Sequence, residues 1–258
     1  MKEALAADTP TQSKYEVRFD WGREGLASIA QGAGVIVVID SISFTTTVGL
    51  AVEHGLEVVP FDGVGEPADA AAAADAVLAG PRGASGITLS PSSITPENVA
   101  AIAPQSRVLV SSLNGSRLSA AAAAFGVPVV AASLRNRTAV AEWILQQQVD
   151  TGDRLRVAIV AAGESRSDGS TRFAVEDLLV AGAVIDALAT VGIDYAAPEA
   201  AAACAAYLGL KRAVGHLLTA SVTGQQLIEA DARIDVELAG KLDSSAVVPV
   251  LGEFGFHA

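Results

Sequence analysis

Several aliphatic runs of the sequence end in small polar, acidic or cationic residues, while the runs themselves carry almost none. The residues that follow the runs at 34–39, 107–112, 127–133 and 155–162 include Asp40, Thr45, Thr46, Thr47, Asn114, Gly115, Ser116, Arg117, Arg135, Asn136, Arg137, Glu164, Arg166 and Asp168. Carboxylates can hold a divalent cation, and arginines can hold an oxyanion through charge and paired donors. This set of residues is suited to binding a metal ion and a phosphate-like group together.

The acidic candidates for a cation site are Asp40, Glu164, Glu176, Asp177 and Asp243. Magnesium prefers one or two carboxylates and keeps several of its waters. Glu176 and Asp177 are adjacent in the otherwise apolar stretch VEDLLVAG, and neighbours on a helix point about 100° apart. One of the two therefore faces protein. The alternative is that Glu176 forms a surface ion pair with Arg172, four residues earlier, and that Asp177 is an exposed acid.

The hydroxyl and amide side chains in these loops have two interpretations. A helix start offers free backbone N–H groups and a positive dipole end, which favours phosphate. Thr and Asn also cap helices without any ligand, for about 1 kcal/mol each. Capping alone explains any single loop well. Four such loops, three of them with arginines, favour a ligand site, because ligands of open parallel sheets bind beyond the carboxyl ends of the strands.

The elements that must position these residues alternate along the chain. Strands are expected at 34–40, 56–61, 107–112, 127–133 and 155–163, with a last one in 247–254. Helices are expected at 45–55, 66–80, 115–126, 137–148, 172–192 and 198–218, the last broken near Gly209. This alternation is typical of βα units and predicts a mainly parallel sheet with helices on both faces, an α/β fold in three α/β/α layers.

Composition and charge restrict the class of protein. The chain has 258 residues and a formal net charge of −12, which argues against nucleic-acid and anionic-membrane partners. Its single cysteine, Cys204, excludes an internal disulfide and indicates a reducing, cytoplasmic setting. No apolar run reaches the ~18 residues of a membrane span.

The domain organisation is predicted to be simple. Residues 1–14 lack the apolar segment of a secretory signal and are expected to form a flexible tail. Residues 15–258 are expected to form one α/β domain, with two lobes meeting near residue 150 as an alternative. The alanine-rich segment 198–218 suggests a partner face and a homo-oligomer.

Other site classes lack support. There is no G-x-x-x-x-G-K-[ST] phosphate loop and no G-x-S-x-G nucleophile motif. Gly63-x-Gly65 follows a strand as in a dinucleotide site, but no acidic residue lies between Asp75 and Glu97, where a ribose ligand would fall.

Six segments resemble, in order, the motifs of one family: VVID with TTT, GPRG with Ser90-Pro91, LNGSRL, SLRNRTAVAEW, AGESRSDGSTRFAVEDLLVAGAVI and DVELAGKLDSSAVVPVL. The family is the magnesium-dependent 2-phosphosulfolactate phosphatases of the coenzyme M pathway. The resemblance implies an α/β/α fold, a Mg²⁺ ion and hydrolysis of a phosphate monoester of a small anionic acid. It places at or near the site Asp40, Arg82, Asn114, Ser116, Asn136, Glu164, Glu176 and Asp177.

The leading hypothesis is therefore metal-assisted hydrolysis of a small phosphorylated acid. Its catalytic residues would be Asp40, Glu164, Arg82 and Arg135, and its metal ligands Asp40, Glu164, Glu176 and Asp177. Its substrate-binding residues would be Thr45, Thr46, Ser90, Asn114, Gly115, Ser116, Arg117 and Asn136. The chain departs from the family at Ser43, where an arginine is common, and over 85–89, where a Phe-Asp-x-Gly-Asn stretch is usual. The alternative is a non-catalytic anion-binding or assembly protein that keeps the fold.

Overall fold

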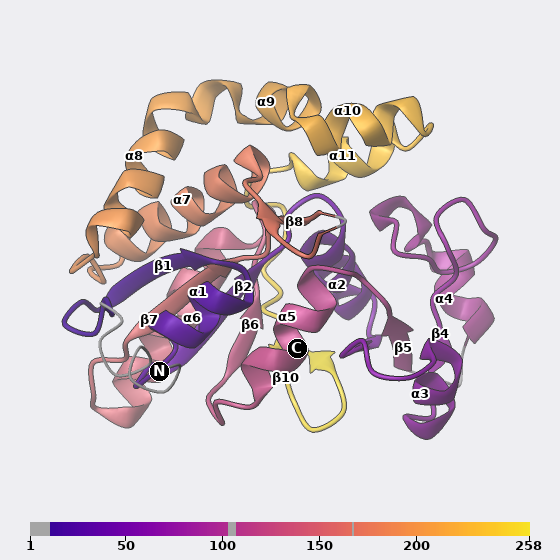
Figure 1. The fold of residues 1–258 in the computed structure, drawn as a ribbon, viewed down its shortest axis with the longest axis horizontal. Coiled ribbons are helices and arrows are strands. Elements are labelled where there is room, and N and C mark those ends of the chain that lie inside the picture. Colours follow the sequence, from indigo (N-terminus) through magenta and orange to yellow (C-terminus); the bar gives the residue numbers. More distant parts are fainter. Residues whose placement is uncertain (1–10, 103–106, 167) are drawn as a thin grey trace.

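A sheet that runs through the whole protein organises the fold. The structure is a computed structural model that describes residues 11–102, 107–166 and 168–258. Within these residues nine strands form one sheet in the order β1-β7-β2-β6-β10-β11-β3-β5-β4 (Figure 1). The strands are β1 (Val17–Trp21), β2 (Val35–Ile39), β3 (Glu57–Pro60), β4 (Val77–Leu78), β5 (Arg107–Val110), β6 (Val129–Ala131), β7 (Val157–Ala161), β10 (Val250–Leu251) and β11 (Phe256–His257). A separate hairpin consists of β8 (Glu164–Ser165) and β9 (Thr171–Arg172).

Helices cover both faces of this sheet. They are α1 (Gly22–Ile29), α2 (Phe44–Glu53), α3 (Pro67–Ala73), α4 (Pro96–Ile102), α5 (Gly115–Ala123), α6 (Arg137–Thr151), α7 (Val175–Thr190), α8 (Pro198–Leu210), α9 (Val214–Ala220), α10 (Val222–Glu229) and α11 (Arg233–Ala239). Successive strand residues point to opposite faces. Thus Val35, Val37 and Ile39 pack with α6, α7 and α8. Ile36 and Val38 pack with α1, α2 and α5. The three-layer α/β/α prediction is confirmed.

The sheet has two parallel halves joined by an antiparallel hairpin. Strands β1, β7, β2 and β6 pair in parallel, and so do β3, β5 and β4. Between the halves, β10 pairs antiparallel with β6 and with β11, and β11 pairs antiparallel with β3. Because the strand direction reverses at each of these three pairings, the strands of one half run antiparallel to the strands of the other. Both halves nevertheless contribute to one core cluster with α2 and α5, which brings the starts of these helices together.

Most predicted elements are confirmed to within a few residues, and two differ. The helix expected over 66–80 is wrong beyond α3: Asp75 has a φ of 50° and ends the turn, and β4 then pairs with β5. The single strand expected in 247–254 is instead the short hairpin β10–β11. The expected break near Gly209 is confirmed, because α8 ends at Leu210 and a 3₁₀ turn leads into α9.

Strand β1 and helix α1 were not expected from the sequence. Arg18 lies within β1 and is 1% exposed, and its guanidinium donates to the backbone carbonyls of Ile29 and Gln31 at 2.8 Å each. These bonds tie β1 to the end of α1. Of the tail predicted over 1–14, residues 1–10 lie outside the described residues. The Gln12 side chain exchanges two hydrogen bonds of 2.9 Å with the backbone of Phe19.

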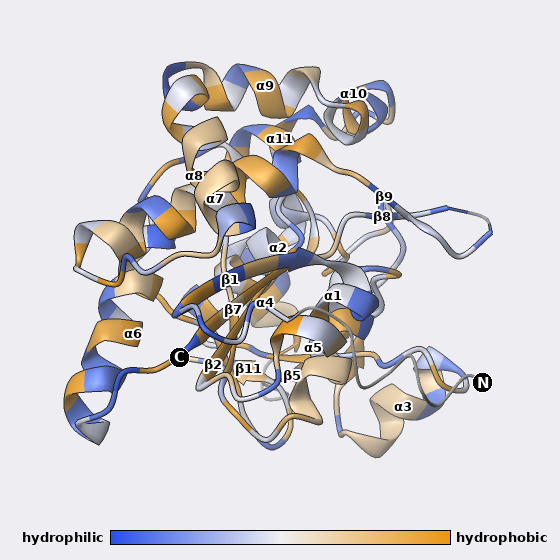
Figure 2. Ribbon diagram, turned by 60° about the vertical axis from the view of Figure 1, so that its left-hand side comes forward, coloured by the Kyte–Doolittle hydropathy of each residue, from blue (hydrophilic) through white to orange (hydrophobic). Residues whose placement is uncertain are grey.

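The C-terminal helices and the β8–β9 hairpin lie beyond the main layers. Helices α9, α10 and α11 pack together above the start of α7 (Figure 1). The hairpin extends away from the body of the protein and is coloured as hydrophilic, whereas the central strands are hydrophobic (Figure 2). No helix in the described part of the chain combines the length and apolar character needed to cross a bilayer.

Candidate active site

Asp40 lies between the starts of two helices. It directly follows β2, and α2 begins four residues later. The backbone N–H of Gly115, the first residue of α5, donates to Asp40 Oδ2 at 2.8 Å, and Ser112 Oγ donates to the same atom at 3.3 Å. A β-carbon on Gly115 would lie 2.6 Å from Asp40 Oδ2 and 2.5 Å from the Phe44 ring. Only glycine allows this approach of α5 to the carboxylate.

The pKa of Asp40 reflects opposing effects. Burial raises this pKa to about 6, the N–H of Gly115 opposes the rise, and the Glu164 carboxylate adds to it. The Ser112 hydroxyl and the Phe44 N–H lower it slightly. The environment therefore disfavours an uncompensated negative charge on Asp40, which a bound cation would offset.

Asp177 joins the ends of β2 and β7. Its Oδ1 accepts from the Ser41 N–H at 2.9 Å, and its Oδ2 accepts from the Gly163 N–H at 3.0 Å. Burial raises the pKa of Asp177 well above its ordinary value, the Asp40 charge adds to the rise, and the Ser41 N–H opposes it. Both oxygens of Asp177 are thus engaged by backbone groups, which holds two adjacent strand ends in register.

Glu176 is the second buried acid at the start of α7. It is 3% exposed, and its Oε1 has no hydrogen-bond partner among the described residues. An unpaired buried carboxylate oxygen is costly unless something binds it. The adjacent acids both face protein, so the prediction that at least one does so is confirmed, and no ion pair between Arg172 and Glu176 exists among the described residues.

Glu164 belongs to the same acidic neighbourhood. Its Oε2 accepts from Asn114 Nδ2 at 3.1 Å, and its Oε1 accepts from Thr223 Oγ1 at 3.1 Å. Asn114 Oδ1 in turn accepts from the backbone N–H of Ser165 at 3.1 Å. These bonds fix the β8 strand against the start of α5 and bring Glu164 within the electrostatic range of Asp40.

The metal prediction requires carboxylates that converge. No group of three or more His, Cys, Asp or Glu side chains with metal-site geometry occurs within residues 11–102, 107–166 and 168–258. The acids Asp40, Glu164, Glu176 and Asp177 also form no ion pairs within this part of the chain. Carboxylates that pair with no cationic side chain are available to a cation held by one or two of them and by water.

Arg82 lies near the start of α2 and is held by a buried acid. Its guanidinium pairs with Asp235 of α11, which is fully buried, and donates to Ser90 Oγ at 2.9 Å and to Ser43 Oγ at 3.1 Å. Ser90 also donates to Asp235, and the Ser92 N–H donates to it at 2.8 Å. Arg82 therefore connects the GPRG loop, α2 and α11.

Two predicted residues after β6 are engaged elsewhere. Arg135 pairs with Glu53 at the end of α2 at 2.9 Å. Asn136 Oδ1 accepts from the Ser133 N–H at 2.9 Å, and its Nδ2 donates to the Val247 carbonyl at 3.1 Å. These contacts shape the β6–α6 turn, and no described contact links either residue to Asp40.

The predicted hydroxyl residues are buried and bond to backbone carbonyls. Thr45 Oγ1 donates to the Asp40 carbonyl at 2.9 Å, and Thr46 Oγ1 donates to the Ser41 carbonyl at 2.5 Å. Ser116 Oγ lies 2.7 Å from the Phe61 carbonyl and 2.9 Å from that of Val110. These hydroxyls tie the starts of α2 and α5 to the strand ends, and none of them caps a helix, because each donates to a carbonyl and the N-cap residues of α2 and α5 make no side-chain capping bond.

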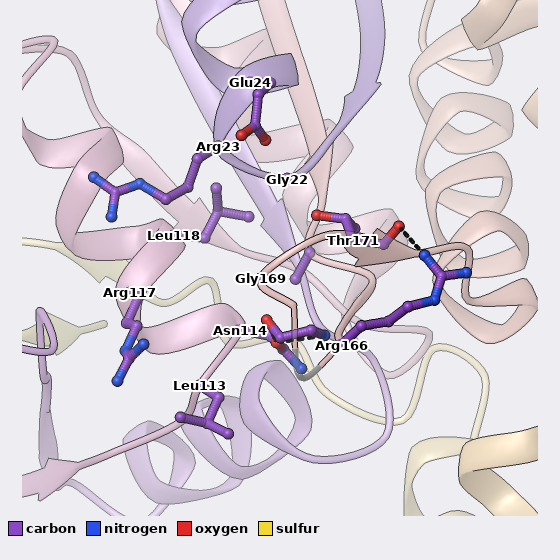
Figure 3. Close-up of a pocket in the computed structure, with 12 residues that line it drawn as sticks. Gly22, Arg23, Glu24, Leu113, Asn114, Arg117, Leu118, Arg166, Gly169 and Thr171 are labelled. Carbon is purple, nitrogen blue, oxygen red and sulfur yellow. Dashed lines mark hydrogen bonds between the residues drawn. The ribbon is translucent and has the colours of Figure 1, made fainter.

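A pocket of about 360 Å³ opens beside this region (Figure 3). Asn114 and Arg117 of α5 line it, together with Arg166 of the hairpin and Arg23 of α1. Sequence reasoning missed Arg23, because neither β1 nor α1 was expected. It also missed Thr223 and Asp235, whose partners are 59 and 153 residues away and leave no local signal.

The fold and these contacts define an α/β/α protein with an acidic cluster beside an arginine-lined pocket at the strand ends. Residues 24–253 match the profile of the family described as 2-phosphosulpholactate phosphatase. The chain belongs to this family.

Curated relatives support the assignment. The chain is 33% identical over 228 residues to a probable 2-phosphosulfolactate phosphatase of Parasynechococcus marenigrum, covering 83% of this chain and 87% of the relative. It is 34% identical over 233 residues to a protein with the same name in Synechococcus sp. strain CC9605, covering 85% and 89%. A third, from Thermus thermophilus, is 32% identical over 221 residues, covering 84% and 87%.

Proposed function

We propose that the protein is a Mg²⁺-dependent phosphatase that hydrolyses a small phosphorylated acid, with 2-phosphosulfolactate as the first candidate. The observation that carries the proposal is the position of Asp40. A half-buried carboxylate with a pKa raised to about 6 lies between the starts of α2 and α5, beside an arginine-lined pocket. The family to which the chain belongs, and the names of its relatives, support the same reaction.

The acidic residues would hold the cation. Asp40 and Glu164, whose charges interact, are the proposed ligands, and the unpartnered Oε1 of Glu176 is a further oxygen donor. Asp177 fits a ligand role less well because backbone N–H groups occupy both of its oxygens and cannot turn away, whereas the two side chains that bind Glu164 can. When bound, the ion would neutralise phosphoryl oxygens and lower the pKa of a coordinated water.

The start of α5 would hold the phosphate. The Leu118 N–H bonds to the Asn114 carbonyl as the helix begins, so the N–H groups of Ser116 and Arg117 precede the helical ladder. Such N–H groups and the helix dipole favour an oxyanion. The Arg117 side chain adds a positive charge at the pocket wall.

Arg82 is the proposed source of positive charge at the start of α2. Its contact with Ser43 places its guanidinium at that helix terminus, where it would bind a phosphoryl oxygen. The catalytic role of Arg135 stays a prediction, and its ion pair with Glu53 directs its charge elsewhere.

Phosphate release tests the proposal. Purified protein is incubated with a panel of small phosphate monoesters, including 2-phosphosulfolactate, in Mg²⁺ and in EDTA. We expect release in Mg²⁺ alone and its loss in Asp40→Asn, while Asp153→Asn, an exposed loop variant, keeps full activity. If neither the wild type nor the variants release phosphate, and phosphate or sulfonate ligands raise the melting temperature, the alternative of a non-catalytic anion-binding protein is supported instead.

Self-association also stays a proposal. Leu208 and Leu210 of α8 are each 43% exposed, and a second copy could cover them. Light scattering at working concentration should then report a mass above that of one chain, and a monomer would contradict this proposal.

A further inference from the structure

The arginines of the pocket beside Asp40 differ in their engagement. Arg166 donates to Ser170 Oγ and to the Thr171 carbonyl, at 3.2 Å each. Within the described residues, Arg23 and Arg117 form no ion pair and their side chains donate no hydrogen bond. Their charges are therefore available to a ligand. Glu24 is the one acid among the residues that line the pocket.

The two available arginines come from neighbouring helices. Arg23 lies in the first turn of α1 and Arg117 in the first turn of α5, and these helices contact each other. Figure 3 shows both side chains on one side of the pocket, with Arg166 on the other. In a chain with a net charge of −12, two unpaired arginines at one pocket form a local positive site.

The pocket adjoins the proposed phosphate site. Asn114 lines the pocket, and Gly115, the next residue, binds Asp40. A phosphate held at the start of α5 would leave the rest of a small substrate in this pocket. An oxyanion a few bonds from the ester oxygen would then come within reach of the arginines.

We infer that Arg23 and Arg117 form a second anion subsite, and that Arg23 sets the preference of the enzyme for phosphate monoesters that carry an additional carboxylate or sulfonate. The inference rests on the proposed phosphatase function of the same site. Arginine suits this role because its planar fork of donors matches both oxyanions.

A comparison of two substrates tests the subsite. Phosphoglycolate carries a carboxylate besides its phosphate, and ethyl phosphate is a counterpart of similar size that lacks this second anionic group. We expect Arg23→Gln to lower the ratio of their kcat/KM values about tenfold, as for one lost charge-assisted contact. Arg23→Lys should keep most of the ratio. Arg212→Gln, which removes an exposed arginine far along the chain, should keep all of it. An unchanged ratio in Arg23→Gln would overturn the inference.

Binding without turnover separates the two proposals. Calorimetry with phosphonoacetate and with phosphonomethanesulfonate measures Kd for a phosphonate that carries a carboxylate or a sulfonate. The subsite is supported if Arg23→Gln raises either Kd about tenfold, and the probe with the larger rise identifies the preferred group. It is overturned if neither Kd changes. If the wild type binds these probes through Arg23 but releases no phosphate from any ester, the phosphatase proposal fails and the subsite stands.

Discussion

The backbone N–H of Gly115 donates to the carboxylate of Asp40 at 2.8 Å across 75 residues of sequence. The bond joins the end of β2, in one parallel half of the sheet, to the start of α5, which follows β5 in the other half. It therefore places a single carboxylate between two helix starts. The proposed cation and phosphate sites both depend on this contact.

Replacing Gly115 with alanine should disrupt this contact. The new β-carbon would lie 2.6 Å from Asp40 Oδ2 and 2.5 Å from Phe44, so both must move. We expect the free energy of unfolding to fall by about 1–3 kcal/mol and metal-dependent phosphate release to fall at least about tenfold. Urea unfolding and initial rates measure the two effects.

Gly209→Ala is the matched control for this substitution. A β-carbon at Gly209 meets no atom within 4 Å, and the residue lies within α8. This variant should gain up to about 1 kcal/mol of stability from helix propensity and keep its rate. If both glycine variants behave alike, the close contact at Gly115 is not important.

Stability in EDTA should depend on pH through Asp40. Its pKa is raised from 3.8 to about 6 in the folded protein, so the folded state binds more protons than the unfolded state between these values. The contribution of a protonated Asp40 is present below about pH 4 and is lost as the pH rises through about 6. Asp40→Asn avoids this loss.

The measurement is the free energy of unfolding of both proteins from about pH 4 to about pH 7.5. The advantage of Asp40→Asn over the wild type should grow by about 1–3 kcal/mol across this interval. Adding Mg²⁺ at the upper end should stabilise the wild type only. Parallel pH profiles would show that Asp40 ionises normally.

Removing the Asp177 carboxylate should separate the ends of β2 and β7. Asp177→Ala leaves the N–H groups of Ser41 and Gly163 without their acceptors, which should cost about 2–5 kcal/mol. Asp177→Asn keeps one acceptor oxygen and should cost about 1–3 kcal/mol. Chemical unfolding checks the order, with Asp153→Ala expected within about 0.5 kcal/mol of the wild type. Equal losses in Asp177→Ala and Asp153→Ala would contradict it.

The ion pair between Arg82 and the buried Asp235 should show strong coupling. Asp235→Leu leaves the Arg82 guanidinium without its partner and should cost about 3–5 kcal/mol. Adding Arg82→Met should recover part of this loss, because no unpaired charge remains. A double-mutant cycle measures the coupling, and additive effects would mean that the two residues do not interact.

Much of the fold could be predicted from the sequence because its buried strands are uninterrupted aliphatic runs. All five residues of β2 and of β7 are buried, as such runs indicate. Strand β1 could not be predicted in this way, because the charged Arg18 interrupts its apolar residues. The Arg18 guanidinium is buried by virtue of bonds to the Ile29 and Gln31 carbonyls, which come close to it only in the folded protein. Strand β4 lies in an alanine-rich stretch whose helical propensity gives no sign that β5 will pair with it.

The candidate site was predictable in part for a similar reason. Residue type and strand-end position pointed to Asp40, Asn114 and Glu164. In the structure the Asn114 side chain donates to Glu164, and the N–H of Gly115, which follows Asn114, donates to Asp40. The Glu164 charge also raises the pKa of Asp40. Residue type could not show that Asn136 is committed to Ser133 and Val247. The partners that decide a side chain's role come from tertiary contacts, which composition and spacing do not encode.

The position of a bound metal ion tests the central claim most directly. Crystals grown with Mn²⁺ as a substitute for Mg²⁺, together with phosphate, would locate the ion by its anomalous scattering. We predict one strong peak within coordination distance of an Asp40 carboxylate oxygen, with phosphate between it and the start of α5. A manganese peak bound only at sites remote from Asp40, with phosphate away from α5, would contradict the account.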